Sequence, residues 1–475
     1  MTVYRCICQK EFNEMPEVCP FCGNSNPGKW TVITTQEDKI VPPPPPENER
    51  EDEKKKDRKK KDRKEDPTDS GKKPHKGLIA AILILLVLIV GAAGALYVLH
   101  MRGDIYLPFP GGTYWKHNVM AAYTDVDTKQ EENNKVFSSS VPKSTVRSIE
   151  FFDTVKDAPS AAWDVSENND RSVLAWMNGD RLCIAGKGGV SAPKNCNNLF
   201  CAFVNAESIE FNGCFHTENV TTMNSMFWGC KALKTLDLTG FDTSNVTDLN
   251  TMFNICESLQ RIYGLNGFRT EQVTDMSYLF AGDYALQSID LSSFNTSAVG
   301  NMRHMFHACE KLTQIDVSNF DTSDVADMSY MFCGCKALQN LDLSGFDTSN
   351  VTTMEAMFRD CASLISVDVS GFHTASVINM SSMFAGDIVL RDVNVNSFDT
   401  SKVRTMNRMF YNCGRIPELD ISSFTTEALT DASYFFYKEK EYLVSGQKIV
   451  YRKAGFKALP ESARVRFMND ETWDD

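Results

Sequence analysis

The sequence predicts an α/β repeat solenoid, built from a parallel sheet and short helices, together with a small zinc-binding head and a single transmembrane helix. Three observations predict this fold class: a 26-residue repeat, a 23-residue apolar run, and two close cysteine pairs near the N-terminus. With 475 residues the chain is too long for one compact domain, since a domain usually holds about 150 residues.

The repeat is marked by a phenylalanine that follows Met, Leu or Phe. Its positions are 26 residues apart, with one step of 27: Phe227, Phe253, Phe280, Phe306, Phe332, Phe358, Phe384, Phe410 and Phe436. A degenerate earlier copy lies at 199–200. Units of this length that recur at a fixed step indicate a solenoid, in which each coil stacks on its neighbours.

The residue pattern within each unit predicts a strand followed by a short helix. In residues 341–344 (LDLS) apolar and polar residues alternate, which is typical of a strand with Leu inward and Asp outward. The polar residues 347–350 (DTSN) are good N-caps, and the apolar residues after them have the spacing of one helix face: Val351, Met354, Met357, Phe358 and Cys361. A strand plus a helix in each unit is the leucine-rich-repeat pattern.

A ladder of cysteines lies three residues after the repeat phenylalanine: Cys230, Cys256, Cys309, Cys335, Cys361 and Cys413. Asp283 and Asp387 interrupt this ladder, so its members cannot all pair with neighbours. We therefore expect free thiols that act as small, buried apolar side chains. Bridges among Cys183, Cys196, Cys201 and Cys214 are the alternative. Nothing in the sequence explains an Asp at an inward position.

A second ladder occupies an outward strand position: Asp237, Asp290, Asp316, Asp342, Asp368 and Asp420. One interpretation is an acidic, partner-binding sheet face that attracts cationic ligands or Ca²⁺. The other is that each Asp makes its strand soluble and bonds a nearby Ser or Thr.

The apolar run, residues 77–99, contains no charged residue. It would span about 34 Å as a helix, which is long enough to cross a bilayer. On its N-terminal side, Lys54–Lys64 holds nine basic and two acidic residues. This bias predicts a single-pass protein of the bacterial cell membrane, with the N-terminus in the cytoplasm and the repeat domain outside.

The head contains two cysteine pairs, Cys6 with Cys8 and Cys19 with Cys22. Four thiolates at this spacing predict a tetrahedral, structural zinc site of the zinc-ribbon type. Disulfides and a rubredoxin-like iron site are the alternatives. A site with four protein ligands leaves no open position for catalysis.

Charge and motifs exclude other classes of function. After residue 76 the chain holds 47 acidic against 32 basic residues, and nucleic-acid binding needs a dense basic face instead. No nucleophile motif, phosphate loop or carboxylate pair stands out, and the pair His304 and His307 is best interpreted as surface variation. The sequence therefore predicts that the protein is not an enzyme.

Several segments also match a known pattern: 226–233 (MFWGCKAL), 347–352 (DTSNVT), and, ahead of the repeats, 163–166 (WDVS) and 185–193 (AGKGGVSAP). They resemble the repeats and the N-terminal cap of the BspA-like leucine-rich-repeat surface proteins of bacteria, over roughly residues 145–436. The resemblance implies a cell-surface protein used for adhesion or host contact. It does not imply the zinc-ribbon-like head.

The predicted domain order is as follows: a cytoplasmic zinc-ribbon-like domain (1–30), a Pro-rich, charged linker (31–76), the transmembrane helix (77–99), an ectodomain N-terminal region and cap (103–198), the solenoid (199–436) and a C-terminal cap (437–475). The predicted function is binding or adhesion to an extracellular protein or carbohydrate. The alternatives are a sensor that signals to a cytoplasmic partner of the ribbon, and a structural envelope protein.

Overall fold

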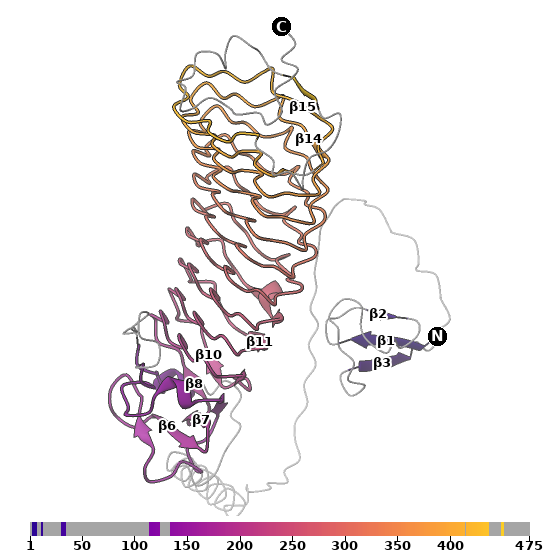
Figure 1. The fold of residues 1–475 in the computed structure, drawn as a ribbon. Helices are drawn as coiled ribbons and strands as arrows, with labels where there is room; N and C mark the ends of the chain where they lie inside the picture. Colours follow the sequence, from indigo (N-terminus) through magenta and orange to yellow (C-terminus); the bar gives the residue numbers. More distant parts are fainter. Residues whose placement is uncertain are drawn as a thin grey trace, which may run out of the picture. The chain divides into compact units, whose positions relative to one another are not determined.

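The computed structural model describes residues 2–6, 11–12, 30–34, 114–123, 134–413, 415–436 and 448–450. These residues belong to two units, Met1–Ala81 and Ile82–Asp475, and each unit is described by itself (Figure 1). The apolar run 77–99, most of the linker 31–76 and most of the C-terminal region 437–475 lie outside the described residues.

The first unit contains a three-stranded antiparallel sheet. Its strands are β1 (Thr2–Cys6), β2 (Glu11–Phe12) and β3 (Trp30–Thr34), in the order β2-β1-β3. In the register of β1 and β3, Cys6 pairs with Trp30. The other three predicted zinc ligands, Cys8, Cys19 and Cys22, lie outside the described residues.

The second unit begins with a mixed sheet that caps the repeats. Five strands form it, in the order β5-β6-β7-β4-β9: β4 (Ser148–Phe152), β5 (Trp163–Asp164), β6 (Val173–Asn178), β7 (Arg181–Gly186) and β9 (Ser208–Glu210). β4 runs parallel to β7 and β9, whereas β5, β6 and β7 are antiparallel. A second parallel pair, β8 (Val190–Ser191) with β10 (Phe215–His216), joins the cap to the first coil.

The cap sheet is covered on both faces, which explains the unbroken apolar run at the start of β6. One face packs on a core that continues through the whole repeat array, from Met120 to Phe436. The other face covers a smaller cluster that includes Leu174, Trp176 and Ala185. Residues that alternate between two buried faces must all be apolar.

Behind the cap, coils of 26 residues stack into a column, drawn from magenta to yellow in Figure 1. Parallel bridges join one residue of each coil to the next: Asn195, Thr222, Asp248, Asp275, Asn301, Asp327, Thr353, Asn379, Thr405 and Asp431. Short parallel strand pairs form a second line: β11 (Thr235–Asp237) with β12 (Arg261–Tyr263), β13 (Ser366–Val367) with β14 (Asp392–Val393), and β15 (Glu418–Asp420) with β16 (Lys448–Val450). The 26-residue repeat is thus confirmed.

The predicted fold class is wrong, because the described residues contain no α-helix. Their helical elements are three 3₁₀ turns, η2 (Tyr114–His117), η4 (Lys143–Thr145) and η5 (Leu265–Gly267). The array is therefore built from bridges, short strands and turns, rather than from a strand and a helix in each repeat. No helix in the described part of the chain is long and apolar enough to cross a membrane.

The hydrogen bonds of the first coil explain why the predicted helix does not form. The N–H groups of Ser225 and Phe227 donate to carbonyls of the next coil, while Met226 and Trp228 donate three residues back within their own coil. Ser225 also has a left-handed backbone, with φ of 55°. An α-helix needs right-handed residues throughout and a bond from every N–H to the residue four positions back. Turns closed over three residues still place residues i and i+3 on one side, so the apolar spacing resembles that of a helix.

The core of the array is a column of stacked phenylalanines. From Phe227 to Phe410, ring centroids of successive coils lie 5.3–6.0 Å apart and the planes differ by at most 12°. Each ring is fully buried. Burial of one such side chain contributes roughly 1.5–3 kcal/mol, so the column holds the coils in register.

Candidate functional site

Each aspartate of the outward ladder closes a turn, and two of them, Asp237 and Asp420, end strands. In all six aspartates Oδ1 accepts the backbone N–H two residues further on, at 2.9–3.1 Å. Asn394 makes the same contact without a charge. At Asp316 the hydrogen bonds from Ser318 hold the pKa of the carboxyl below its usual value. The turn explains why this residue type recurs, and the partner-binding role predicted for this face stays a prediction.

The predicted zinc site also stays a prediction, since three of its four cysteines lie outside the described residues. Within the described part of the chain, no group of three or more His, Cys, Asp or Glu side chains is placed to hold a metal ion.

The inward cysteines are free thiols, as expected. All eleven cysteines between Cys183 and Cys413 are unbridged, and apart from Cys214 they are buried. Ladder thiols donate to the carbonyl of a phenylalanine in the preceding coil, as Cys309 does to Phe280 at 3.2 Å. Burial raises the pKa of five ladder thiols, that of Cys230 to about 12; the others are Cys256, Cys309, Cys335 and Cys361. They are therefore packed side chains and not reactive nucleophiles.

Asp283 and Asp387 occupy the same inward position and are fully buried. In each, Oδ1 accepts the N–H of a cysteine in the preceding coil, from Cys256 at 2.9 Å and from Cys361 at 2.8 Å. Oδ2 has no partner among the described residues. Burial raises the pKa of both carboxyls well above its usual value, which favours the neutral acid.

A ladder of stacked rings lies on the side of the array, two residues before the repeat phenylalanine. The ring of His304 stacks between Tyr278 and Tyr330, with both centroid distances 4.4 Å. The guanidinium of Arg303 lies 5.6 Å from the Tyr330 ring centroid, and its Nε approaches the Tyr278 hydroxyl at 3.5 Å. The Tyr330 hydroxyl donates to Glu355 at 2.6 Å. We call Tyr278, Arg303, His304 and Tyr330 the ring face.

The ring face is neutral apart from its arginine. Burial, and then the charges of His307 and Arg303, lower the pKa of His304 to about 3, so its imidazole is uncharged at pH 7. Burial and the hydrogen bond to Glu355 raise the pKa of Tyr330 to about 12. The stack therefore offers aromatic edges and one guanidinium, held in place by neighbouring side chains.

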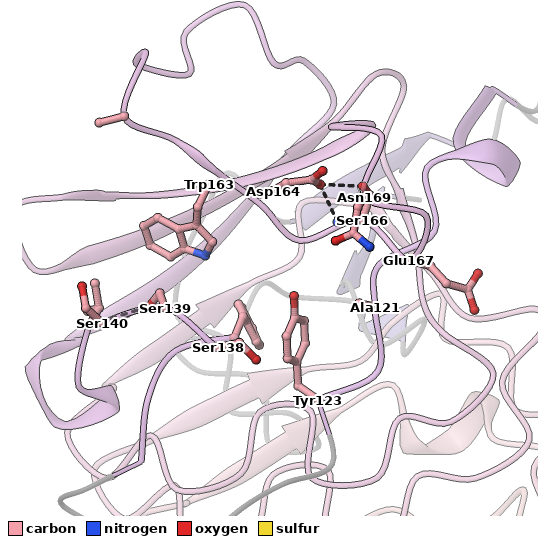
Figure 2. Close-up of a pocket in the computed structure, with 13 residues that line it drawn as sticks. Ala121, Tyr123, Ser138, Ser139, Ser140, Trp163, Asp164, Ser166, Glu167 and Asn169 are labelled. Carbon is pink, nitrogen blue, oxygen red and sulfur yellow. Dashed lines mark hydrogen bonds between the residues drawn. The ribbon is translucent and has the colours of Figure 1, made fainter.

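The cap contains a pocket of about 740 Å³ beside the edge strand β5 (Figure 2). Three separate segments line it: 121–123, 137–141 and 161–169. Aromatic side chains contribute Trp163, Tyr123 and Phe137, and the polar residues are Ser138, Ser139, Ser140, Asp164, Ser166, Glu167 and Asn169. This volume is within the range usual for small-molecule sites.

Hydrogen bonds fix the ionisation of the polar groups. Burial acts to raise the pKa of Asp164, but bonds from Ser166 and Arg171 outweigh it and the pKa lies below its usual value. Burial and the charge of Asp164 raise the pKa of Tyr123, so its phenol keeps its proton. The indole N–H of Trp163 is buried and has no hydrogen-bond partner among the described residues.

The sequence did not reveal either of these two sites. Aligning the coils two residues before each repeat phenylalanine would have placed His304 between Tyr278 and Tyr330, since these residues are 26 apart. The pocket has no such signal, because its three segments meet only in the folded cap.

The fold defines a class, namely a repeat protein whose coils stack through parallel bridges and a phenylalanine column. Residues 194–282, 260–364 and 336–448 match the family described as Mycoplasma protein of unknown function, DUF285. Together these matches extend over more than half of the chain, so the chain belongs to this family. No curated protein matches the sequence.

Proposed function

We propose that this protein is a bacterial cell-surface binding protein whose ring face holds an extracellular protein ligand and so serves adhesion. One observation carries the proposal: coils of the same fold form without an aromatic ring at the position of Tyr278, His304 and Tyr330. The same backbone position is Ser225, Thr251, Ala356 and Ser382 in other coils, and all of these have the same left-handed φ. Rings that the repeat does not require are available for recognition.

The composition of the ring face supports a protein partner. Tyrosine and arginine are enriched where protein interfaces concentrate their binding energy. The rings are also fixed before binding, since Arg303 contacts both tyrosines and Glu355 holds the Tyr330 hydroxyl. A ligand that meets fixed side chains loses less conformational entropy on binding.

The proposed localisation is the bacterial cell membrane, with the repeat array outside the cell. It rests on the charge asymmetry around Lys54–Lys64 and on the resemblance to BspA-like surface proteins. The family match is compatible with a repeat protein of the surface. We propose a binding role and not a catalytic one.

The test changes the rings to the residue that other coils have. Cells that display the full-length protein carry the triple variant Tyr278→Ser, His304→Ser and Tyr330→Ser. We expect their adhesion to an array of extracellular matrix proteins to fall about tenfold or more, which corresponds to ~1.4 kcal/mol. The matched control is Tyr263→Asp, because Tyr263 is 40% exposed on β12, where other coils have Asp.

Unchanged adhesion of the triple variant, with a melting temperature close to that of the parent, would contradict the proposed role of the ring face. Equal loss in the Tyr263→Asp control would point to a different side of the array.

A further inference from the structure

We infer that the cap pocket is a binding site for a neutral carbohydrate, separate from the ring face. The inference starts from the edge strand β5, where Trp163 and Asp164 adjoin the pocket (Figure 2). It requires no ligand on the repeat array, so either proposal can fail while the other stands.

The charge of the pocket excludes anions. Among the thirteen described residues that line it, two are acidic, Asp164 and Glu167, and none is Lys, Arg or His. Asp164 is ionised at pH 7, because the hydrogen bonds it accepts from Ser166 and Arg171 hold its pKa low. A phosphate or an acidic sugar would meet this carboxylate without a compensating cation. The ligand is therefore neutral or cationic.

The indole N–H of Trp163 favours a neutral ligand over a cationic one. Its N–H is buried and lacks a hydrogen-bond partner within the described residues. In Figure 2 the indole nitrogen lies on the side of the ring that faces Ser138 and Tyr123. A buried donor without a protein partner is costly, and a ligand that brings an acceptor oxygen into the pocket satisfies it. A sugar hydroxyl accepts from the indole and can donate its own proton to a carboxylate. A quaternary ammonium group has no acceptor.

The walls of the pocket suit a polyol. Trp163 and Tyr123 supply apolar surface for the C–H face of a sugar ring, and the Tyr123 ring packs 4.9 Å from the buried ring of Phe137. The serine hydroxyls and the Tyr123 phenol both donate and accept, as neighbouring sugar hydroxyls do. An apolar surface with a few convergent polar groups is the usual composition of a small-ligand site.

The backbone at the pocket wall is held in an unusual conformation. Phe137 and Ser138 are consecutive left-handed residues, with φ of 42° and 59°. Phe137 is buried against Phe200 and Phe203 of the core, which keeps this segment in place. Strained residues persist only where their surroundings hold them, and they cluster at ligand sites.

The test follows the indole N–H signals of the full-length protein, labelled with ¹⁵N-tryptophan, by NMR. The probes are glucose, galactose, N-acetylglucosamine and maltose, with N-acetylneuraminic acid and tetramethylammonium for comparison. We expect at least one neutral sugar to shift the Trp163 signal saturably, and the acidic sugar to leave it unchanged. The Trp163→Phe variant identifies the signal.

Trp163→Phe keeps an aromatic ring and removes the N–H, so we expect it to weaken sugar binding about tenfold. The control Trp228→Phe changes a partly exposed tryptophan of the first coil and should leave the affinity within about twofold. A shift with tetramethylammonium and none with any neutral sugar would overturn the inference. So would full affinity in Trp163→Phe, or no saturable shift with any sugar probe. The triple ring-face variant should bind sugar as the parent does.

Discussion

The cap and the repeat array both bury a polar atom that has no partner among the described residues, but the surroundings of this atom differ between the two regions. In the array, Oδ2 of Asp283 lies inside a closed core, and burial raises the pKa of its carboxyl well above the usual value. In the cap, the N–H of Trp163 lies beside a pocket and can meet a ligand. The comparison teaches that an unpartnered group indicates a binding site only where space for a ligand adjoins it.

The largest effect should come from opening a cavity in the array. Phe306→Ala removes a fully buried ring that stacks on Phe280 and Phe332 at 5.7 and 5.6 Å. We expect a loss of about 3–5 kcal/mol in the free energy of unfolding, measured with urea. Tyr284→Ala, at a side chain 42% exposed, should cost less than about 0.5 kcal/mol.

In the cap, Trp163→Phe should cost about 1 kcal/mol or less, since it removes an N–H that has no partner there. If Trp163→Phe destabilised the protein as much as Phe306→Ala, the cap would be as closely packed as the array and the contrast between them would fail.

The second effect concerns the buried acid. Asp283→Cys restores the residue of the ladder and removes the unpartnered oxygen, so it should stabilise the protein by roughly 1–3 kcal/mol at pH 7. Cys256 keeps a second acceptor for its N–H, the Phe253 carbonyl at 3.2 Å. Urea unfolding of the parent and the variant at the same pH measures the difference.

This stabilisation should depend on pH. The pKa of Asp283 is raised in the folded protein. The contribution of this carboxyl to the stability of the parent is therefore fully present below the unfolded pKa of about 4, and it is lost as the pH rises towards the folded pKa. The gap between Asp283→Cys and the parent should therefore be small near pH 4 and grow towards pH 8. A gap that is constant over this range would show that Asp283 is ionised in the folded state.

The smallest predicted effect on stability comes from His304, and it depends on pH in the opposite direction from that of Asp283. The folded pKa of His304 is lowered to about 3, so its stabilising contribution is present above the unfolded value of about 6.5 and is lost as the pH falls towards 3. The ring is only half-buried, so solvent reduces the effect. His304→Ser should flatten the loss of stability between pH 6.5 and 4, measured by thermal melts. An equal loss in parent and variant would place the acid-sensitive group elsewhere.

Much of the architecture could be predicted from the repeat. The step of 26 residues predicted the coils, the buried phenylalanines and the free inward thiols, because a residue that recurs at one position meets the same surroundings in every coil. The predicted helix failed for a local reason. Residues such as Ser225 adopt a left-handed backbone, and their N–H groups bond to the next coil instead of to their own.

By itself, then, the sequence determined what repeats: the stacking period, the inward ladders and the outward aspartates. Only the tertiary structure decided what is brought together from separate segments. The stack of Tyr278, His304 and Tyr330 depends on the distance between coils, and the pocket around Trp163 depends on how three segments of the cap meet. Periodicity reports contacts between equivalent residues, such as those of the stack, whereas the pocket is made by residues that are not equivalent.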